Sequence, residues 1–295
     1  MRPTRACVAA LLVAVAFGAS GPGAALADEM STGRIQIEYV PPKNPDHEAL
    51  YEQLMERQSL EKISAILKPF RLPQDVKIRT VGCDGVSNAW YQPINGVPTV
   101  TVCYEYLDDL WKRLPMMMTH GVDEPTQTDA LVGQMFFAFA HEFGHLVFDV
   151  YDVPVFGHEE DAADNFATYI MLQFQADAPR LIMGAAWSYR AFIKNLRENP
   201  KTVIPLTAFS SNHGQPEERF FNLECMAYGS DPKRYAELVE KGLLPQSRAR
   251  DCSYEYDVMK FAFDIEILPH IDMAMANQVL AQDWLAGAPP PRALR

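Results

Sequence analysis

Two histidines and a glutamate have the spacing of a metal site within residues 131–150. His141 and His145 are four residues apart, so on a helix both imidazoles lie on one face and can reach one ion. Glu142 directly follows the first histidine and can approach a water molecule on that ion. This is the HExxH pattern, in which two imidazoles bind Zn²⁺ and the glutamate is a general base. The sequence therefore predicts a hydrolytic metal centre.

The surrounding residues help to distinguish a metal site from structural histidines. Two histidines and one glutamate at this spacing arise by chance in on the order of one chain in a hundred. The run LVGQMFFAFAHEFGHLVFDV is otherwise apolar, so each of these side chains needs a buried partner, and a metal supplies one. A membrane span is disfavoured because charged side chains are costly in lipid. The remaining alternative is a pair of hydrogen-bonded histidines in a buried helix.

A third metal ligand is expected on the element that follows. Residues 158–167 (HEEDAADNFA) offer four donors, of which we favour Glu160. On a helix, Glu160 shares a stripe with Asp164 and with two alanines small enough for close helix packing. Asp164 can then accept a hydrogen bond from the far nitrogen of a liganding histidine. The macrodipole of a helix also favours acidic residues in its first turn, which explains Glu159 and Asp161.

These residues resemble the glutamate-zincins, the thermolysin-like metallopeptidases. HEFGH at 141–145 and EDAAD at 160–164 are similar to the HExxH and ExxxD motifs of those enzymes. SNAWY at 87–91 is similar to their Asn-Ala-aromatic edge strand, which hydrogen-bonds an extended peptide substrate. More closely, the chain from about residue 35 to 285 resembles a family of exported bacterial metallopeptidase-like proteins, known mainly as a domain of unknown function.

The resemblance implies one zinc ion per chain, bound by His141, His145 and Glu160. It also implies that Glu142 is the general base and that Asp164 supports a liganding histidine. Only fourteen residues separate His145 from Glu160, fewer than in thermolysin. The shape of the substrate cleft therefore does not transfer from that enzyme.

Two further roles follow from the same resemblance. Asn88 and Ala89 are expected to bind the backbone of the substrate. A downstream histidine stabilises the oxyanion in thermolysin-like enzymes. We expect His213 to have this catalytic role, with Arg219 as the second choice.

The implied function is a secreted zinc metallopeptidase that acts on a peptide or protein substrate. One alternative is a non-catalytic, metal-stabilised peptide-binding protein of the cell envelope. Another is an amidase acting on cell-wall crosslinks. The intact Glu142 favours hydrolysis over binding alone.

Composition limits the other classes of partner. Of the 295 residues, 48% are hydrophobic, which is enough to bury a substantial core. The chain has 26 Lys and Arg against 38 Asp and Glu, a net charge of -12. Such a surface does not neutralise nucleic-acid phosphates, so no nucleic-acid partner is expected.

The first residues have the pattern of a cleaved secretory signal peptide over 1–27. Arg2 and Arg5 precede an apolar run at 7–19, and small residues stand around a cleavage point before Asp28. The run is too short to span roughly 30 Å of hydrocarbon, so no stable membrane insertion is expected after cleavage. The mature protein would be periplasmic or extracellular.

Signal cleavage leaves an even number of cysteines, which suits disulfides in an oxidising compartment. Three pairings are possible, and we favour Cys83 with Cys103 and Cys225 with Cys252. In the chain-entropy model, each of these loops gives about 3 kcal/mol of stabilisation. Buried free thiols are the alternative.

The periodicity of apolar residues predicts the elements that position these groups. An amphipathic helix is expected over 45–67, followed by strands at 76–81, 88–91 and 99–104 that form an antiparallel meander. A loop is expected over 111–128. The later helices are expected over 129–149, 159–175, 178–197, 216–228, 231–241 and 246–266.

The predicted fold is therefore α+β and zincin-like. A small antiparallel sheet, with an Asn-Ala edge strand, packs on the HExxH helix and is followed by a mostly helical C-terminal part. One metallopeptidase-like domain spans 28–285, with a β-rich part at 70–108 and a helical part at 129–285. A flexible tail is expected over 286–295.

Overall fold

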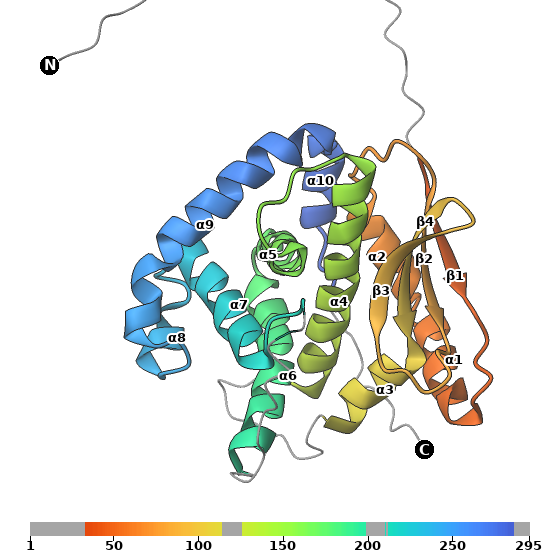
Figure 1. Ribbon diagram of the computed structural model, residues 1–295, viewed down its shortest axis with the longest axis horizontal. Coiled ribbons are helices and arrows are strands. Elements are labelled where there is room, and N and C mark those ends of the chain that lie inside the picture. The colour runs from red at the N-terminus through yellow and green to blue at the C-terminus, as the bar shows by residue number, and fades with distance from the viewer. Residues whose placement is uncertain (1–32, 114–125, 199–209, 211, 286–295) are drawn as a thin grey trace, which may run out of the picture. The chain divides into compact units, whose positions relative to one another are not determined.

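A computed structural model gives the fold of residues 33–113, 126–198, 210 and 212–285. The predicted leader over 1–27 and the tail over 286–295 lie outside these described residues and stay predictions. The described part has the expected α+β class, with one small sheet and a mostly helical remainder (Figure 1). No helix in these ranges has both the length and the apolar character needed to cross a membrane.

The four strands are β1 (Ile35–Tyr39), β2 (Val76–Val81), β3 (Ala89–Ile94) and β4 (Val97–Cys103). Their order in the sheet is β1-β2-β4-β3. The β1–β2 and β2–β4 pairs are parallel, and only the β3–β4 pair is antiparallel. The predicted antiparallel meander is therefore wrong, because β2 pairs with β4 and not with β3.

Burial and turn chemistry explain this strand order. Residues 98–103 of β4 are all buried, as expected for a central strand with neighbours on both sides. β3 contains Pro93, which has no N–H to donate and is tolerated at a sheet edge. Asn95 and Gly96 both have positive φ, so their tight turn folds β4 back beside β3.

The α-helices among the described residues are α1 (Glu48–Glu56), α2 (Ser59–Leu67), α3 (Tyr104–Arg113), α4 (Gln127–Val150), α5 (Glu159–Leu172), α6 (Ala178–Glu198), α7 (Pro216–Ser230), α8 (Ala236–Glu240), α9 (Gln246–Glu266) and α10 (Met273–Leu280). The predicted positions of α4, α5, α6, α7 and α9 are confirmed to within a few residues. α8 is shorter than the helix predicted over 231–241.

Three helical features differ from the prediction. The single helix expected over 45–67 is broken at Gln58, which has a left-handed φ of 52° and separates α1 from α2. α3 begins at Tyr104, directly after β4, but Tyr104 was predicted to be the last residue of the strand. α10 was not predicted.

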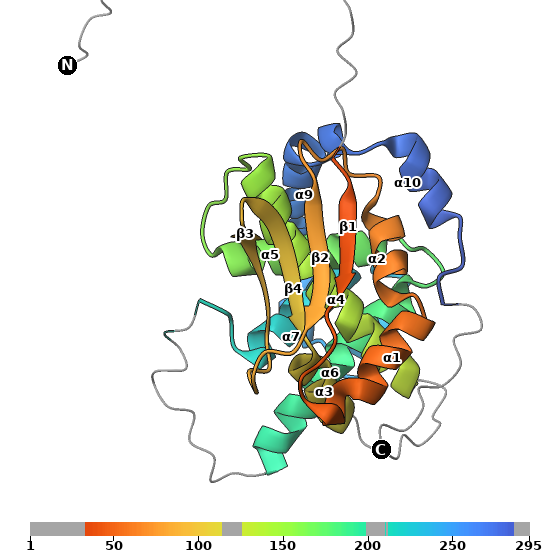
Figure 2. The ribbon, with the colours of Figure 1, turned by 90° about the vertical axis from the view of Figure 1, so that its right-hand side faces the viewer.

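α4 packs between the sheet and the later helices. Figure 1 shows the sheet on one side of α4 and α5, α6 and α7 on the other. In Figure 2 the strands β3 and β4 lie in front of α4, with α1 and α2 beside β1. The Tyr91 hydroxyl of β3 donates a hydrogen bond to the Asp149 carboxylate of α4. The edge strand is therefore tied to the helix that carries the HExxH residues.

The N-terminus of α4 is fixed by a capping box. The Asp129 N–H donates to the Thr126 hydroxyl at 3.1 Å, and the Thr126 N–H donates to the Asp129 carboxylate at 3.2 Å. Arg180 of α6 donates two further hydrogen bonds to the same carboxylate, at 2.7 and 3.1 Å. The start of α4 is thereby held against α6.

Glycines allow α4 to approach its neighbours closely. A Cβ at Gly144 would stand 3.1 Å from the Phe166 ring and 3.4 Å from the Ala163 Cα, which confirms the predicted close packing of α4 on α5. At the crossing with α6, a Cβ at Gly184 would stand 2.1 Å from the Asp129 carbonyl oxygen. Backbone atoms occupy that space, so a side chain at Gly184 requires the helices to separate.

We predict that Gly184→Ala lowers the free energy of unfolding by about 2 kcal/mol or more, because α4 and α6 must move apart. The matched control is Gly82→Ala, because nothing lies within 4 Å of the added Cβ. The control is expected to change stability by less than about 0.5 kcal/mol. Urea unfolding followed by circular dichroism measures both variants. Equal stabilities would contradict the close crossing.

The structure contains two disulfides, and they are the pairs favoured from the sequence. Cys83–Cys103 has an S–S distance of 2.03 Å and joins the segment before β3 to the end of β4. Cys225–Cys252 has an S–S distance of 2.05 Å and joins α7 to α9. The first disulfide therefore anchors the segment that carries Asn88, and the second anchors α7, which carries Arg219.

Candidate metal centre

His141, His145 and Glu160 bring their ligand atoms together between α4 and α5. The two Nε2 atoms are 3.3 Å apart. The Glu160 Oε2 atom is 3.1 Å from the Nε2 of His141 and 3.5 Å from that of His145. The second candidate cluster in the described part of the chain is Cys83, Cys103 and Glu105. Its sulfur atoms are already joined in a disulfide, so it is not a comparable site.

A carboxylate orients each histidine from behind. The Nδ1 atoms of His141 and His145 each lie 2.7 Å from a carboxylate oxygen, of Asp164 and Glu159 respectively. An ionised carboxylate only accepts hydrogen bonds, so each Nδ1 carries a proton. In the neutral form that can bind a metal, each Nε2 then keeps its lone pair on the side of Glu160. Glu159, which was explained by the helix macrodipole alone, is therefore also a partner of His145.

This donor set fits a metal ion. Two imidazole lone pairs and a carboxylate oxygen repel one another at these distances unless a positive charge lies among them. Protons supply that charge when no ion is bound. Burial lowers the pKa of His141, but the carboxylates of Asp164 and Glu160 outweigh burial and raise it to about 9. A metal ion bound at this site would replace those protons.

Asp164 is held in place by Arg219 of α7. The guanidinium donates two hydrogen bonds to the carboxylate, at 2.6 and 2.8 Å. It also lies 5.2 Å from the centre of the Tyr189 ring. Burial would raise the pKa of Asp164, but the charge of Arg219 and the hydrogen bond from His141 lower it to about 2. Arg219 thus lies behind His141, bound to Asp164.

The segment before α7 brings His213 and Asn212 to the centre. The His213 Nε2 atom lies 3.0 Å from the Glu160 Oε2 atom, and Asn212 donates to the other carboxylate oxygen at 3.3 Å. The His213 side chain is 47% exposed, whereas that of His141 is only 4% exposed. His213 is therefore the histidine of this cluster that is most open to a ligand. Asn212 was not predicted.

Glu142 is buried beside the ligand cluster. Only 7% of the residue is exposed. Burial raises the pKa of its carboxyl group, while the neighbouring His141 and His145 oppose the shift. A carboxylate whose proton affinity is raised in this way is a better proton acceptor than an exposed glutamate.

Asn88 and Ala89 lie at the start of the edge strand. The Cys103 N–H donates to the Asn88 carbonyl at 3.1 Å, so position 88 hydrogen-bonds β4. Inter-strand hydrogen bonds alternate in an antiparallel pair, and Ala89 opposite Val102 is the next position. The N–H and C=O of Ala89 therefore point away from β4, to the free edge of the sheet.

Comparison with protein families matches residues 39–264 to a family described as "Putative metallopeptidase". The chain belongs to this family. The family description implies a metal ion, and His141, His145 and Glu160 are able to hold one. No curated protein matches the chain. No solved structure matches it either.

We predict that Arg219→Lys lowers the affinity for Zn²⁺ by about 10- to 100-fold, because Asp164 loses its two-point contact and no longer orients His141. Competition with a coloured chelator measures the affinity. Arg180→Lys is the matched control, since Arg180 also holds a carboxylate of α4 but lies remote from the ligands. Unchanged Zn²⁺ affinity in a folded Arg219→Lys protein would contradict this role.

Proposed function

We propose that the protein is an exported zinc-dependent peptidase that hydrolyses peptide bonds. The observation that carries this proposal is the convergence of two imidazole nitrogens and one carboxylate oxygen beside a buried glutamate. Their separations of 3.1, 3.3 and 3.5 Å support zinc. In a tetrahedral zinc site with bonds of about 2.1 Å, neighbouring ligand atoms are about 3.4 Å apart.

His141, His145 and Glu160 would hold the ion, and Asp164 and Glu159 would keep the two imidazoles in the liganding tautomer. Bound zinc polarises a water molecule and the carbonyl of the scissile bond. Glu142 accepts the proton of the attacking water and then delivers it to the leaving nitrogen.

His213 is proposed to stabilise the oxyanion. Its partial exposure and its position 3.0 Å from Glu160 support this role. Arg219, the second choice, is less suited because both of its hydrogen bonds go to Asp164. Arg219 therefore supports His141 through Asp164, and His213 is the better placed of the two to face the substrate.

The substrate is proposed to bind as an additional strand along the free edge of β3. The outward N–H and C=O of Ala89 would pair with the substrate backbone, as in β-augmentation. Asn88 stands next to them and supplies a side-chain amide. The Tyr91–Asp149 hydrogen bond supports this placement, since it keeps the edge strand beside α4.

The same proposal includes export through the predicted signal peptide over 1–27. Two disulfides are consistent with an oxidising compartment, because such bonds rarely persist in the cytosol. The mature protein would then act in the periplasm or outside the cell.

We predict that Glu142→Gln lowers kcat by about 10²- to 10⁴-fold while zinc stays bound, because only the proton acceptor is lost. In contrast, His141→Ala and Glu160→Ala are expected to lose the zinc. Mass spectrometry of a cleaved peptide library measures turnover, and elemental analysis measures zinc. Glu52→Gln, an exposed position of α1, is the control and should behave like the wild type.

Full proteolysis by Glu142→Gln would contradict the assignment of the base. Zinc that remains in Glu160→Ala would contradict the third ligand. Tight peptide binding without products in the wild type would instead favour the non-catalytic peptide-binding protein.

We predict that Ala89→Pro raises KM for extended peptides by about tenfold, because one backbone donor to the substrate is lost. The β3–β4 ladder should survive, since Ala89 makes no hydrogen bond to β4 at this position. Ala89→Gly keeps the donor and is the matched control. Steady-state kinetics on one peptide compares the variants. An unchanged KM in a folded Ala89→Pro protein would contradict substrate pairing at this edge.

A further inference from the structure

An apolar groove lies between α9 and the segment that joins α4 to α5. It has a volume of about 700 Å³. In Figure 1 the connecting segment arches from the end of α4 toward α5, beside α9. Three large apolar side chains on its walls are open to solvent: Phe156 is 99% exposed, Tyr254 72% and Val258 51%. Apolar patches of this kind mark binding surfaces.

The charged residues along the groove are all acidic. They are Asp161, Asp164, Glu255 and Glu266, and no lysine, arginine or histidine lines the groove within the described ranges. Arg219 pairs with Asp164 and Arg248 pairs with Glu255. No ion pair among the described residues includes Asp161 or Glu266. The groove therefore suits an occupant that is apolar and positively charged.

The groove adjoins the metal centre through a second, polar cavity. This cavity has a volume of about 630 Å³ and is lined in part by His213. It shares Asp161 and Asn222 with the groove. The two cavities therefore adjoin at Asp161 and Asn222, which is where a chain bound beside His213 would pass into the groove.

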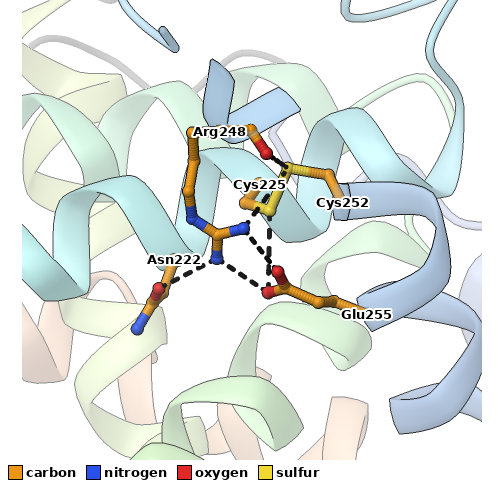
Figure 3. Close-up of a disulfide and its surroundings, with 5 residues drawn as sticks. All are labelled: Asn222, Cys225, Arg248, Cys252 and Glu255. Carbon is orange, nitrogen blue, oxygen red and sulfur yellow. Dashed lines mark hydrogen bonds and ion pairs between the residues drawn. A yellow bond between two sulfur atoms is a disulfide. The ribbon is translucent and has the colours of Figure 1, made fainter. Parts of the chain in front are cut away.

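Residues that line the two cavities are joined in a hydrogen-bonded cluster, drawn in Figure 3. Arg248 lines the polar cavity and donates to both carboxylate oxygens of Glu255, which lines the groove, at 2.5 and 2.7 Å. Arg248 also donates to Asn222 at 3.3 Å. The Cys225–Cys252 disulfide lies beside this cluster and joins α7 to α9. Arg248 is thus paired with Glu255 and does not neutralise Asp161. The carboxylate of Asp161 is therefore able to attract a cation.

We propose that this groove binds a segment of the polypeptide substrate that carries bulky apolar side chains next to a lysine or arginine. The basic side chain would lie at Asp161 and the apolar side chains between Phe156 and Val258. This proposal rests on the proposed peptidase function and adds the class of substrate. A second copy of the chain fits less well, because it presents the same acidic lining.

The test uses the full mature chain with Glu142→Gln, so that binding is measured without cleavage. Three labelled peptides of equal length serve as probes: one of lysine and leucine, one of glutamate and leucine, and one of lysine and serine. Fluorescence anisotropy gives their Kd values. The lysine-leucine peptide is expected to bind at least about tenfold more tightly than the other two.

Substitutions in the groove locate the binding site. Val258→Ser, Phe156→Ser and Asp161→Asn are each expected to weaken binding of the lysine-leucine peptide by about tenfold. Phe261→Ser is the matched control, since Phe261 is on the same helix and 65% exposed but does not line the groove. The control should leave the Kd unchanged.

The proposal is overturned if no peptide binds, if the glutamate-leucine peptide binds as tightly, or if Phe261→Ser weakens binding as much as Val258→Ser. It is also overturned if sedimentation shows a dimer that Val258→Ser dissociates. Cleavage by the chain with an intact Glu142 is measured separately. Selective binding without any cleavage would support the groove and contradict the proposed peptidase function.

Discussion

The carboxylate of Asp164 is the contact on which the candidate site depends. It accepts hydrogen bonds from His141 of α4 and Arg219 of α7, and it belongs to α5. Three helices are thus joined at one buried anion. Taking such a charge out of water is unfavourable unless its partners surround it. The same carboxylate therefore helps to hold these three helices together and orients the imidazole of His141.

The residues of the site that share a helix face could be predicted from the sequence. His141 and His145 are one helical turn apart, and so are Glu160 and Asp164, so each pair is brought to one face by helix geometry alone. The two helices then need only cross at small residues. The contact of Arg219 with Asp164 spans 55 residues and has no local pattern. Glu159 was equally hidden, since its contact depends on how α4 and α5 cross.

The sheet shows the same division between local and distant pairing. The Asn95-Gly96 turn indicates the β3–β4 hairpin, because a tight turn specifies its own two strands. The pairing of β2 with β4 is parallel and passes over β3, so no turn signals it. β1 was missed for the same reason, since its partner β2 lies far along the chain. Thr and Val alternate along β4, a pattern typical of a half-exposed strand, so the burial of residues 98–103 on both faces was not evident from the sequence either.

Pro93 limits the length over which another strand can pair with the free edge of β3. Its backbone nitrogen falls at an outward position, as Ala89 does, but it has no hydrogen to offer. An incoming strand can therefore find outward donors only near the start of β3. Long continuous pairing with a β-strand of another copy is disfavoured by the same gap. The edge can thus accept a short stretch of extended chain without becoming a template for aggregation.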